Sequence, residues 1–341
     1  MALALVVDVA GARNGVGSYE RLLPSVSTAA DDPSFGPAVA PDAATQGLLL
    51  SAAVAADDDA TRRTARAWLD ADRSPGGWGM PFTWDPFSDG SLTPAGTPFA
   101  STTAVAIDGL LDDGLDPETA REIGAMLVRW GRDAWSDGYY WYSALPQDAV
   151  DVPSGSAMLA GVTARFLTMH AGEALSPDDA TFLRERVGAT FRNVADTQLP
   201  GGRWSYSSRE AIVNYTQLHA SILWGGELAR DAGINPGWSR TDAIASLGAY
   251  GPVFPPDVTD KAARRRRDDS PWATAGTGLA TAWTTRWGGD LRTWSGAMCR
   301  SLRIAPRVAR YDVHALLGLA LLGWCDCPDR PRALPRLATT C

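Results

Sequence analysis

The segment Gly76-Gly77-Trp78-Gly79 indicates the fold, because two later segments of the chain repeat its character. Asp137-Gly138-Tyr139-Tyr140-Trp141-Tyr142 is the second copy, and Gly201-Gly202-Arg203-Trp204-Ser205-Tyr206 is the third. Their tryptophans stand at positions 78, 141 and 204, two equal steps of 63 residues. Each step has room for two helices joined by a short polar turn. A repeat of this length predicts stacked helical hairpins, each of which presents one aromatic loop at the same end.

Apolar side chains recur at helical spacing along almost the whole chain. In 117–135 and in 177–195 they return every three or four residues, which places them on one face of a helix. Asp116-Pro117 and Ser176-Pro177 each supply an N-cap side chain before a proline at the first helical position. Convincing alternating strand patterns are absent from the sequence, so we expect an all-α fold.

Repeated hairpins either form an open solenoid or close into a ring. Long aromatic loops that all lie at one end favour the closed (α/α) toroid, in which inner helices line a central cavity. About five to six hairpins fit the length of the chain. We expect a single toroid domain over 41–330, an irregular N-terminal segment over 1–40 and a C-terminal tail over 331–341.

The composition is that of an ordinary globular protein, since 45% of the 341 residues are hydrophobic and 21% are charged. The formal net charge of -8 argues against a nucleic-acid partner. No apolar run reaches the ~20 residues of a membrane span and no secretory leader is recognisable, so we expect a cytoplasmic protein. Cys325-Asp326-Cys327 is too lean for a zinc site, and we expect no metal or other cofactor. Oligomeric state has no signature in the sequence.

The loop segments also resemble patterns of a known family. Trp78 to Asp85, followed by Pro94 to Pro98, resembles "WGYPFDW … TPN". Trp141 to Asp148, followed by Val152 to Ala160, resembles "SYTPxD … VPNASxLxA". These patterns recur in six-hairpin toroid proteins associated with cell-surface polysaccharide biosynthesis.

The third loop extends this resemblance, which runs in order over 70–230. Gly201 to Tyr206, with Asn214-Tyr215, resembles "DGSWYY … DNFHTG". The likeness implies a six-hairpin glycosidase-like toroid, a class that includes glycoside hydrolases, uronyl epimerases and polysaccharide lyases. Thr216 stands where the family pattern has a histidine, so a histidine-dependent step is not expected at that position.

Sugar chemistry in such a ring needs carboxylates as acid and base, or a tyrosine with a histidine that removes and returns a proton. The acids in or just after the three loops are Asp85, Asp148 and Glu210, and Tyr142 and His219 complete the catalytic candidates. An aromatic neighbour raises a carboxyl pKa by desolvation, which suits a general acid. The ordinary alternatives are a cap or surface acid for each carboxylate, rim packing for the tyrosine and a core position for the histidine.

Tryptophan is abundant, with 14 residues, and its wide face and N–H donor suit flat or ring-shaped ligands. A small-molecule or oligosaccharide substrate is therefore expected, and a tryptophan-rich core is the alternative. The candidate substrate-binding residues are Trp78, Trp84, Tyr140, Trp141, Trp204, Tyr206, Asn214, Tyr215, Asp312 and His314.

An isoprenoid-transforming toroid, such as a terpenoid cyclase or a prenyltransferase, is the second hypothesis. Gln198 to Trp204 matches the Q-x-x-x-G-x-W pattern of triterpene cyclases, in which the tryptophan braces neighbouring repeats. The protonating Asp-x-Asp-Asp acid of those enzymes is absent. Asp112 to Asp116 matches the magnesium-binding DDxxD pattern, but Gly114 and Pro117 break the helix that it needs, which favours a polar turn. A non-catalytic glycan-binding or scaffold toroid is the third hypothesis.

Overall fold

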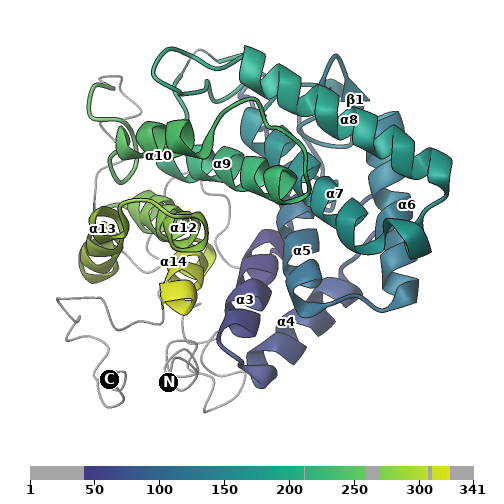
Figure 1. Cartoon of the computed structure of the whole chain (residues 1–341), viewed down its shortest axis with the longest axis horizontal. Helices are drawn as coiled ribbons and strands as arrows, with labels where there is room; N and C mark the ends of the chain where they lie inside the picture. The colour runs from purple at the N-terminus through teal and green to yellow at the C-terminus, as the bar shows by residue number, and fades with distance from the viewer. Residues whose placement is uncertain (1–41, 211, 259–268, 306–308, 323–341) are drawn as a thin grey trace.

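The computed structural model describes residues 42–210, 212–258, 269–305 and 309–322, and Figure 1 shows their arrangement. The expected N-terminal segment (1–40), C-terminal tail (331–341) and Cys325-Asp326-Cys327 lie outside these residues. The described part is almost entirely helical, which confirms the all-α prediction. Its two short strands, β1 (Trp135–Ser136) and β2 (Tyr139–Tyr140), pair antiparallel in the second aromatic loop.

The helices form two concentric layers (Figure 1). The inner helices are α3 (Ala43–Ala55), α5 (Ala100–Asp113), α7 (Pro153–Ala174), α9 (Thr216–Asp231), α12 (Pro271–Trp287) and α14 (Ala309–Leu322). The outer helices are α4 (Asp59–Ala71), α6 (Pro117–Asp133), α8 (Pro177–Asp196), α10 (Arg240–Gly248) and α13 (Leu291–Ile304). Each inner helix packs against the next, and α14 packs against α3. This last contact closes the ring, so the toroid prediction is confirmed and the open solenoid is excluded.

The layer that a helix occupies follows from its sequence. Inner helices are buried around most of their circumference, as in α7, where every residue from Ser154 to Ala164 is buried. Outer helices keep one face exposed, and α8 shows the clearest single buried stripe. In α8 that stripe consists of Ala180, Leu183, Val187, Phe191 and Val194, which are the apolar positions of the predicted face. Polar residues cover the opposite face of such a helix and meet water.

The predicted helix starts are present. The Asp116 side chain accepts hydrogen bonds from the backbone N–H groups of Glu118 and Thr119, and the Ser176 side chain accepts one from that of Asp179. Pro117 and Pro177 occupy the first helical positions, where the missing N–H costs nothing. These caps hold α6 and α8 in place after very short turns from α5 and α7.

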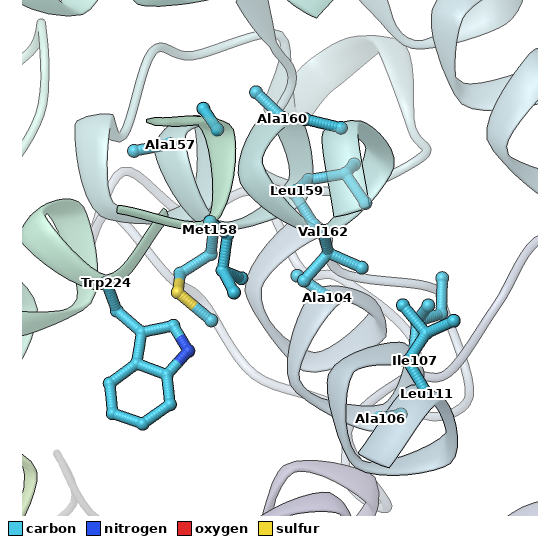
Figure 2. Close-up of a cluster of buried hydrophobic side chains, with 14 of the residues drawn as sticks. Ala104, Ala106, Ile107, Leu111, Ala157, Met158, Leu159, Ala160, Val162 and Trp224 are labelled. Atoms are coloured by element: carbon cyan, nitrogen blue, oxygen red, sulfur yellow. The ribbon is translucent and has the colours of Figure 1, made fainter. Parts of the chain in front are cut away.

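Glycines let three pairs of inner helices approach closely. A Cβ atom on Gly47 of α3 would lie 2.4 Å from the backbone of α5. The corresponding distances are 2.2 Å from Gly161 of α7 to α9 and 2.4 Å from Gly278 of α12 to α14. Small and branched side chains fill the neighbouring core, and Ala104 and Ile107 of α5 belong to the same buried cluster as Leu159 and Val162 of α7 (Figure 2).

Short and long connections alternate along the chain. An inner helix leads to its outer partner through a short turn, whereas the returns to the inner helices α5, α7 and α9 run through long connections over 72–99, 134–152 and 197–215. Every long loop therefore ends where an inner helix begins. The loops that hold Trp78, Trp141 and Trp204 consequently lie at one end of the ring, as their spacing predicts.

Candidate functional site

A row of aromatic rings crosses the end of the ring where the inner helices begin. We call it the aromatic belt, and it consists of Trp84, Phe87, Tyr142, Tyr206, Tyr215, Trp272 and Tyr311. Neighbouring ring centroids in the belt are 5.1 to 6.4 Å apart. A hydrogen bond between the side chains of Tyr142 and Tyr206 joins its two halves. Residues from three loops and two inner helices thus form one continuous row of rings.

Glu210 is an acidic residue beside Tyr206 of the belt. Its side chain is half-buried and makes no hydrogen bond or ion pair to another residue of the described ranges. It is close enough to Tyr206 to raise the pKa of that phenol. Burial raises the same pKa most, and Tyr142 and Tyr215 add to the effect, so Tyr206 stays protonated well above its ordinary range. An unpaired carboxyl beside a protonated phenol can give and accept a proton.

Asp85 organises the first loop. Its carboxylate accepts hydrogen bonds from the backbone N–H groups of Phe87 (3.3 Å), Asp89 (3.2 Å) and Gly90 (2.7 Å). Both oxygens are engaged within the turn that follows Asp85. The geometry corresponds to the capping alternative that the sequence left open for this residue.

Asp148 ties the first loop to the second. One of its oxygens accepts hydrogen bonds from the hydroxyl groups of Thr93 (2.7 Å) and Ser143 (2.6 Å). The residue has no exposed surface, and its other oxygen is enclosed without a partner in the described part of the chain. Substrate therefore has no direct access to this carboxylate in the structure.

The third loop is joined to the other two on the surface of the belt. Arg209 pairs with Asp89 of the first loop at 2.7 Å and lies over the ring of Phe87, with its guanidinium 5.0 Å from the centroid. It also donates to the carbonyl oxygen of Gln147 in the second loop at 3.4 Å. These contacts fix the relative positions of the loops around Glu210.

His219 lies in the core and is neutral. It has no exposed surface, stacks on Tyr250 at 4.2 Å and contacts the Ser246 hydroxyl at 3.1 Å. Burial, with a smaller contribution from the positive charge of Arg203, lowers its pKa to about 3. The apolar stripe on which His219 stands in the sequence corresponds to this core position.

Trp78 and Trp204 brace the ring from within. Both are fully buried, and their indole N–H groups donate to the carbonyl oxygens of Leu69 (2.9 Å) and Val194 (2.6 Å) near the ends of the preceding outer helices. Neither offers a free face to a ligand. The bracing position of Trp204 is the one that its Q-x-x-x-G-x-W pattern implies.

The aromatic residues of the second loop are also held by contacts within the protein. Trp141 is half-buried and donates to the Ser136 hydroxyl at 2.9 Å, while Tyr140 is buried in the main core. Burial raises the pKa of Tyr140 far above its ordinary value. Of the aromatic residues expected to bind substrate, Trp84, Tyr206 and Tyr215 lie in the belt.

The remaining polar candidates surround the start of α9 and of α14. Asn214 precedes α9 and is fully buried, and neither polar atom of its amide has a partner in the described ranges. Asp312 and His314 are buried in the first two turns of α14. His314 contacts Gln217 of α9, a residue that sequence reasoning missed because a lone glutamine on a helix has no distinctive pattern.

A second polar cluster, also missed, lies farther along the inner helices. Arg165 of α7 binds Asp108 at 2.6 Å and Asp112 at 2.7 Å, both on α5. The indole N–H of Trp224 of α9 donates to Asp108 at 3.0 Å. The i, i+4 spacing of the two aspartates was the available signal, but nothing local indicates the arginine, which stands more than 50 residues away.

The aspartates of the DDxxD segment do not converge on one position. Asp112 faces Arg165, whereas Asp113 binds Arg62 and Arg66 on α4. Helix α5 ends at Asp113, and Asp116 already caps α6. The polar-turn interpretation is therefore confirmed. Within the described residues, no group of three or more histidine, cysteine or acidic side chains has a geometry for binding a metal ion.

The described helices include none that is long and apolar enough to cross a membrane. No family model and no curated protein sequence matches the chain. Solved structures do match it, and three of them are of a reducing-end-xylose releasing exo-oligoxylanase.

A Glu-to-Ala variant of that enzyme with xylobiose is 13% identical, has a TM-score of 0.51, and covers 83% of this chain and 82% of its own. The complex with xylose is 12% identical, with a TM-score of 0.50 over 83% and 82% of the two chains. An Asp-to-Ser variant is 14% identical, with a TM-score of 0.52 over 83% and 81%. At this identity the likeness concerns the fold alone, and the chain shares the helical toroid fold of these structures.

Proposed function

We propose that the protein is a carbohydrate-active enzyme that hydrolyses an oligosaccharide at the aromatic belt, with Glu210 as the carboxyl that transfers the proton. The observation that carries this proposal is the position of Glu210, unpaired in the described structure and beside the phenol of Tyr206. Asp85 and Asp148 are both engaged in holding loops. The fold is similar to that of an exo-oligoxylanase whose structures hold xylose and xylobiose, which supports a sugar substrate.

In this reaction the belt residues near Glu210 would have different roles. Tyr142, Tyr215 and Trp84 provide faces and hydroxyl or N–H groups that bind and orient sugar rings. Tyr206 keeps its proton and donates a hydrogen bond to an oxygen that gains negative charge. Glu210 protonates the leaving oxygen or activates a water molecule. Hydrolysis also requires a second carboxyl, for which Asp312 at the start of α14 is our candidate.

The replacement Glu210→Gln tests this function. The amide keeps the size of the side chain but delivers no proton, so the release of reducing sugar from xylo- or gluco-oligosaccharides should fall by roughly 10²–10⁴-fold. Glu185→Gln on α8 is the matched control, because Glu185 is exposed and distant in sequence from the belt. Undiminished activity of Glu210→Gln, with a folded protein, would exclude Glu210 from the chemistry.

Elimination is the second candidate reaction, because Tyr206 lies close to two further tyrosines, Tyr142 and Tyr215, and to the carboxyl of Glu210. Tyrosine can return a proton to the leaving oxygen of a uronic acid unit. The two reactions give different products from a uronate-containing oligosaccharide. Elimination yields an unsaturated, ultraviolet-absorbing product, whereas hydrolysis yields reducing ends without that absorbance.

The other hypotheses rank below these. The likeness to glycosidase structures gives no support to an isoprenoid substrate, and the divergent partners of Asp112 and Asp113 argue against a magnesium site there. A role in cell-surface polysaccharide biosynthesis stays a prediction. A glycan-binding or scaffold protein would bind oligosaccharides with no turnover, which the same assays detect.

One observation argues against the expected cytoplasmic location. Cys299, buried in α13, is disulfide-bonded. Disulfides are rare in the reducing cytosol and common in oxidising compartments. Location therefore stays a prediction, and counting alkylated cysteines with and without prior reduction of the protein tests it.

A further inference from the structure

A glutamine–histidine pair joins two inner helices at the far end of the belt from Glu210. Gln217 lies in the first turn of α9 and His314 in the second turn of α14, and their Nε2 atoms are 2.9 Å apart. Both helices flank α12, so this contact reaches from one neighbour of α12 to the other. Two polar side chains from different helices thereby meet beside α12.

An aromatic ring stands at the start of α12, the helix that packs against both α9 and α14. Trp272, in the first turn of α12, has its ring centroid 5.1 Å from that of Tyr215 and 5.1 Å from that of Tyr311. The ring planes are inclined by 50° and 40°, so neither neighbour stacks flat on the indole. Trp272 is half-buried and keeps part of its surface exposed. An indole face of this kind suits the C–H face of a pyranose ring.

The Gln217 amide has capacity for a further hydrogen bond. Its Oε1 atom is enclosed and has no partner in the described part of the chain. Whichever way the amide is turned, one end faces His314 and the other end is left without a partner. An enclosed polar atom without a partner is destabilising, and a ligand hydroxyl would remove that penalty.

Solvent reaches this part of the inner helix. Gln217 and Ser221 stand four residues apart on one face of α9, and both are half-buried, although α9 packs against α7, α10 and α12.

We propose that Gln217, His314 and Trp272 form a binding subsite for an uncharged sugar unit of the substrate, separate from the unit that reacts at Glu210. The inference rests on the proposed function, since it treats the belt as the path of an oligosaccharide. The indole supports the ring of the sugar, and the amide and imidazole bind its hydroxyl groups. The substrate thus extends from Tyr206 past Tyr215 to α14.

The test measures binding rather than turnover. Glu210→Gln protein is titrated calorimetrically with xylobiose, xylotriose and xylotetraose, and with the matching cello-oligosaccharides. Adding Gln217→Ala should weaken the affinity for the longest ligand that binds by about 5-fold, the effect of one hydrogen bond. Gln198→Ala, another half-buried glutamine but outside the belt, should leave the affinity unchanged. Gln217→Met, which keeps the length of the side chain, replaces the alanine variant if the latter fails to fold.

The outcomes separate the subsite from the reaction. Equal affinities with and without Gln217→Ala, in a protein that binds oligosaccharides, overturn the subsite and leave Glu210 untouched. A Gln217-dependent affinity without turnover by the wild-type protein supports the subsite and overturns the hydrolase. If no oligosaccharide in the set binds, both proposals are overturned.

Discussion

Hydrogen bonding distinguishes the three acids that the sequence places near the belt. The Asp85 carboxylate accepts hydrogen bonds from three backbone N–H groups, and one oxygen of the buried Asp148 carboxylate accepts two from hydroxyl groups. Glu210 alone of the three keeps its oxygens free of partners in the described structure. A carboxyl group acts in catalysis only when its lone pairs and proton are available to the substrate. The accessibility of each carboxyl group is therefore better evidence for a catalytic role than its position in the sequence.

The replacement Asp85→Asn should affect stability more than activity, which is the reverse of what its sequence context suggests. The new amide N–H₂ group cannot accept the bond from Gly90 N–H, so the free energy of unfolding should fall by about 1 kcal/mol. Specific activity of the folded fraction should be retained. Thermal denaturation and an oligosaccharide assay measure both, with the exposed Asp196→Asn as control. A stable Asp85→Asn protein with greatly reduced activity would instead assign Asp85 to catalysis.

The lowered pKa of His219 predicts that the folded protein loses stability in acid. Its pKa is about 3 in the folded protein, below the ordinary value of 6.5, so the unfolded chain binds the proton first. The free energy of unfolding should therefore decrease as pH falls from 6.5 towards 3, by at most about 1.4 kcal/mol per pH unit from this group. In His219→Gln that dependence should be shallower. Urea denaturation between pH 7 and pH 4 measures it, and parallel curves for the two proteins would contradict the assignment.

Among the elements, the inner helices are held close by glycine. Gly161 of α7 and Gly225 of α9 face each other, and a Cβ on either would lie within 2.2 Å of the partner backbone. Gly161→Ala should therefore force the helices apart and lower the free energy of unfolding by about 1–3 kcal/mol.

Gly172 provides the control for that variant. It lies on the same helix, but a Cβ there would meet nothing within 4 Å. Gly172→Ala should be neutral or slightly stabilising, because alanine favours helix more than glycine does. Chemical denaturation compares the two variants, and equal stabilities would refute the close-contact argument.

At the scale of the whole molecule, the contact between α14 and α3 closes the ring. A closed ring has no exposed terminal hairpin, and each inner helix is supported on both sides. A chain that ends at Ala305 lacks α14 and exposes the flanks of α3 and α12. We expect it to lose the cooperative thermal transition seen by circular dichroism, because its remaining inner helices form an open array.

A chain that ends at Arg330, the domain boundary expected from the sequence, is the control for this deletion. It should retain the cooperative transition. A cooperative transition in the chain that ends at Ala305 would show that ring closure contributes little to the stability.

The sequence by itself determined the helices, their caps and the end of the ring at which the aromatic loops lie. These features depend on interactions within a few residues, such as the Asp116 and Ser176 caps, or on a regular repeat, such as Trp78, Trp141 and Trp204. Local spacing is sufficient for both.

Only the tertiary structure decided which side chains are available for chemistry. The bracing of Trp204 and the core position of His219 depend on burial by other helices. The Gln217–His314 contact joins residues 97 positions apart, and Arg165 meets Asp108 across 57. Such contacts arise when the ring closes and brings distant helices together, and burial and hydrogen bonding across it fix the role of each polar residue. No local pattern encodes that information.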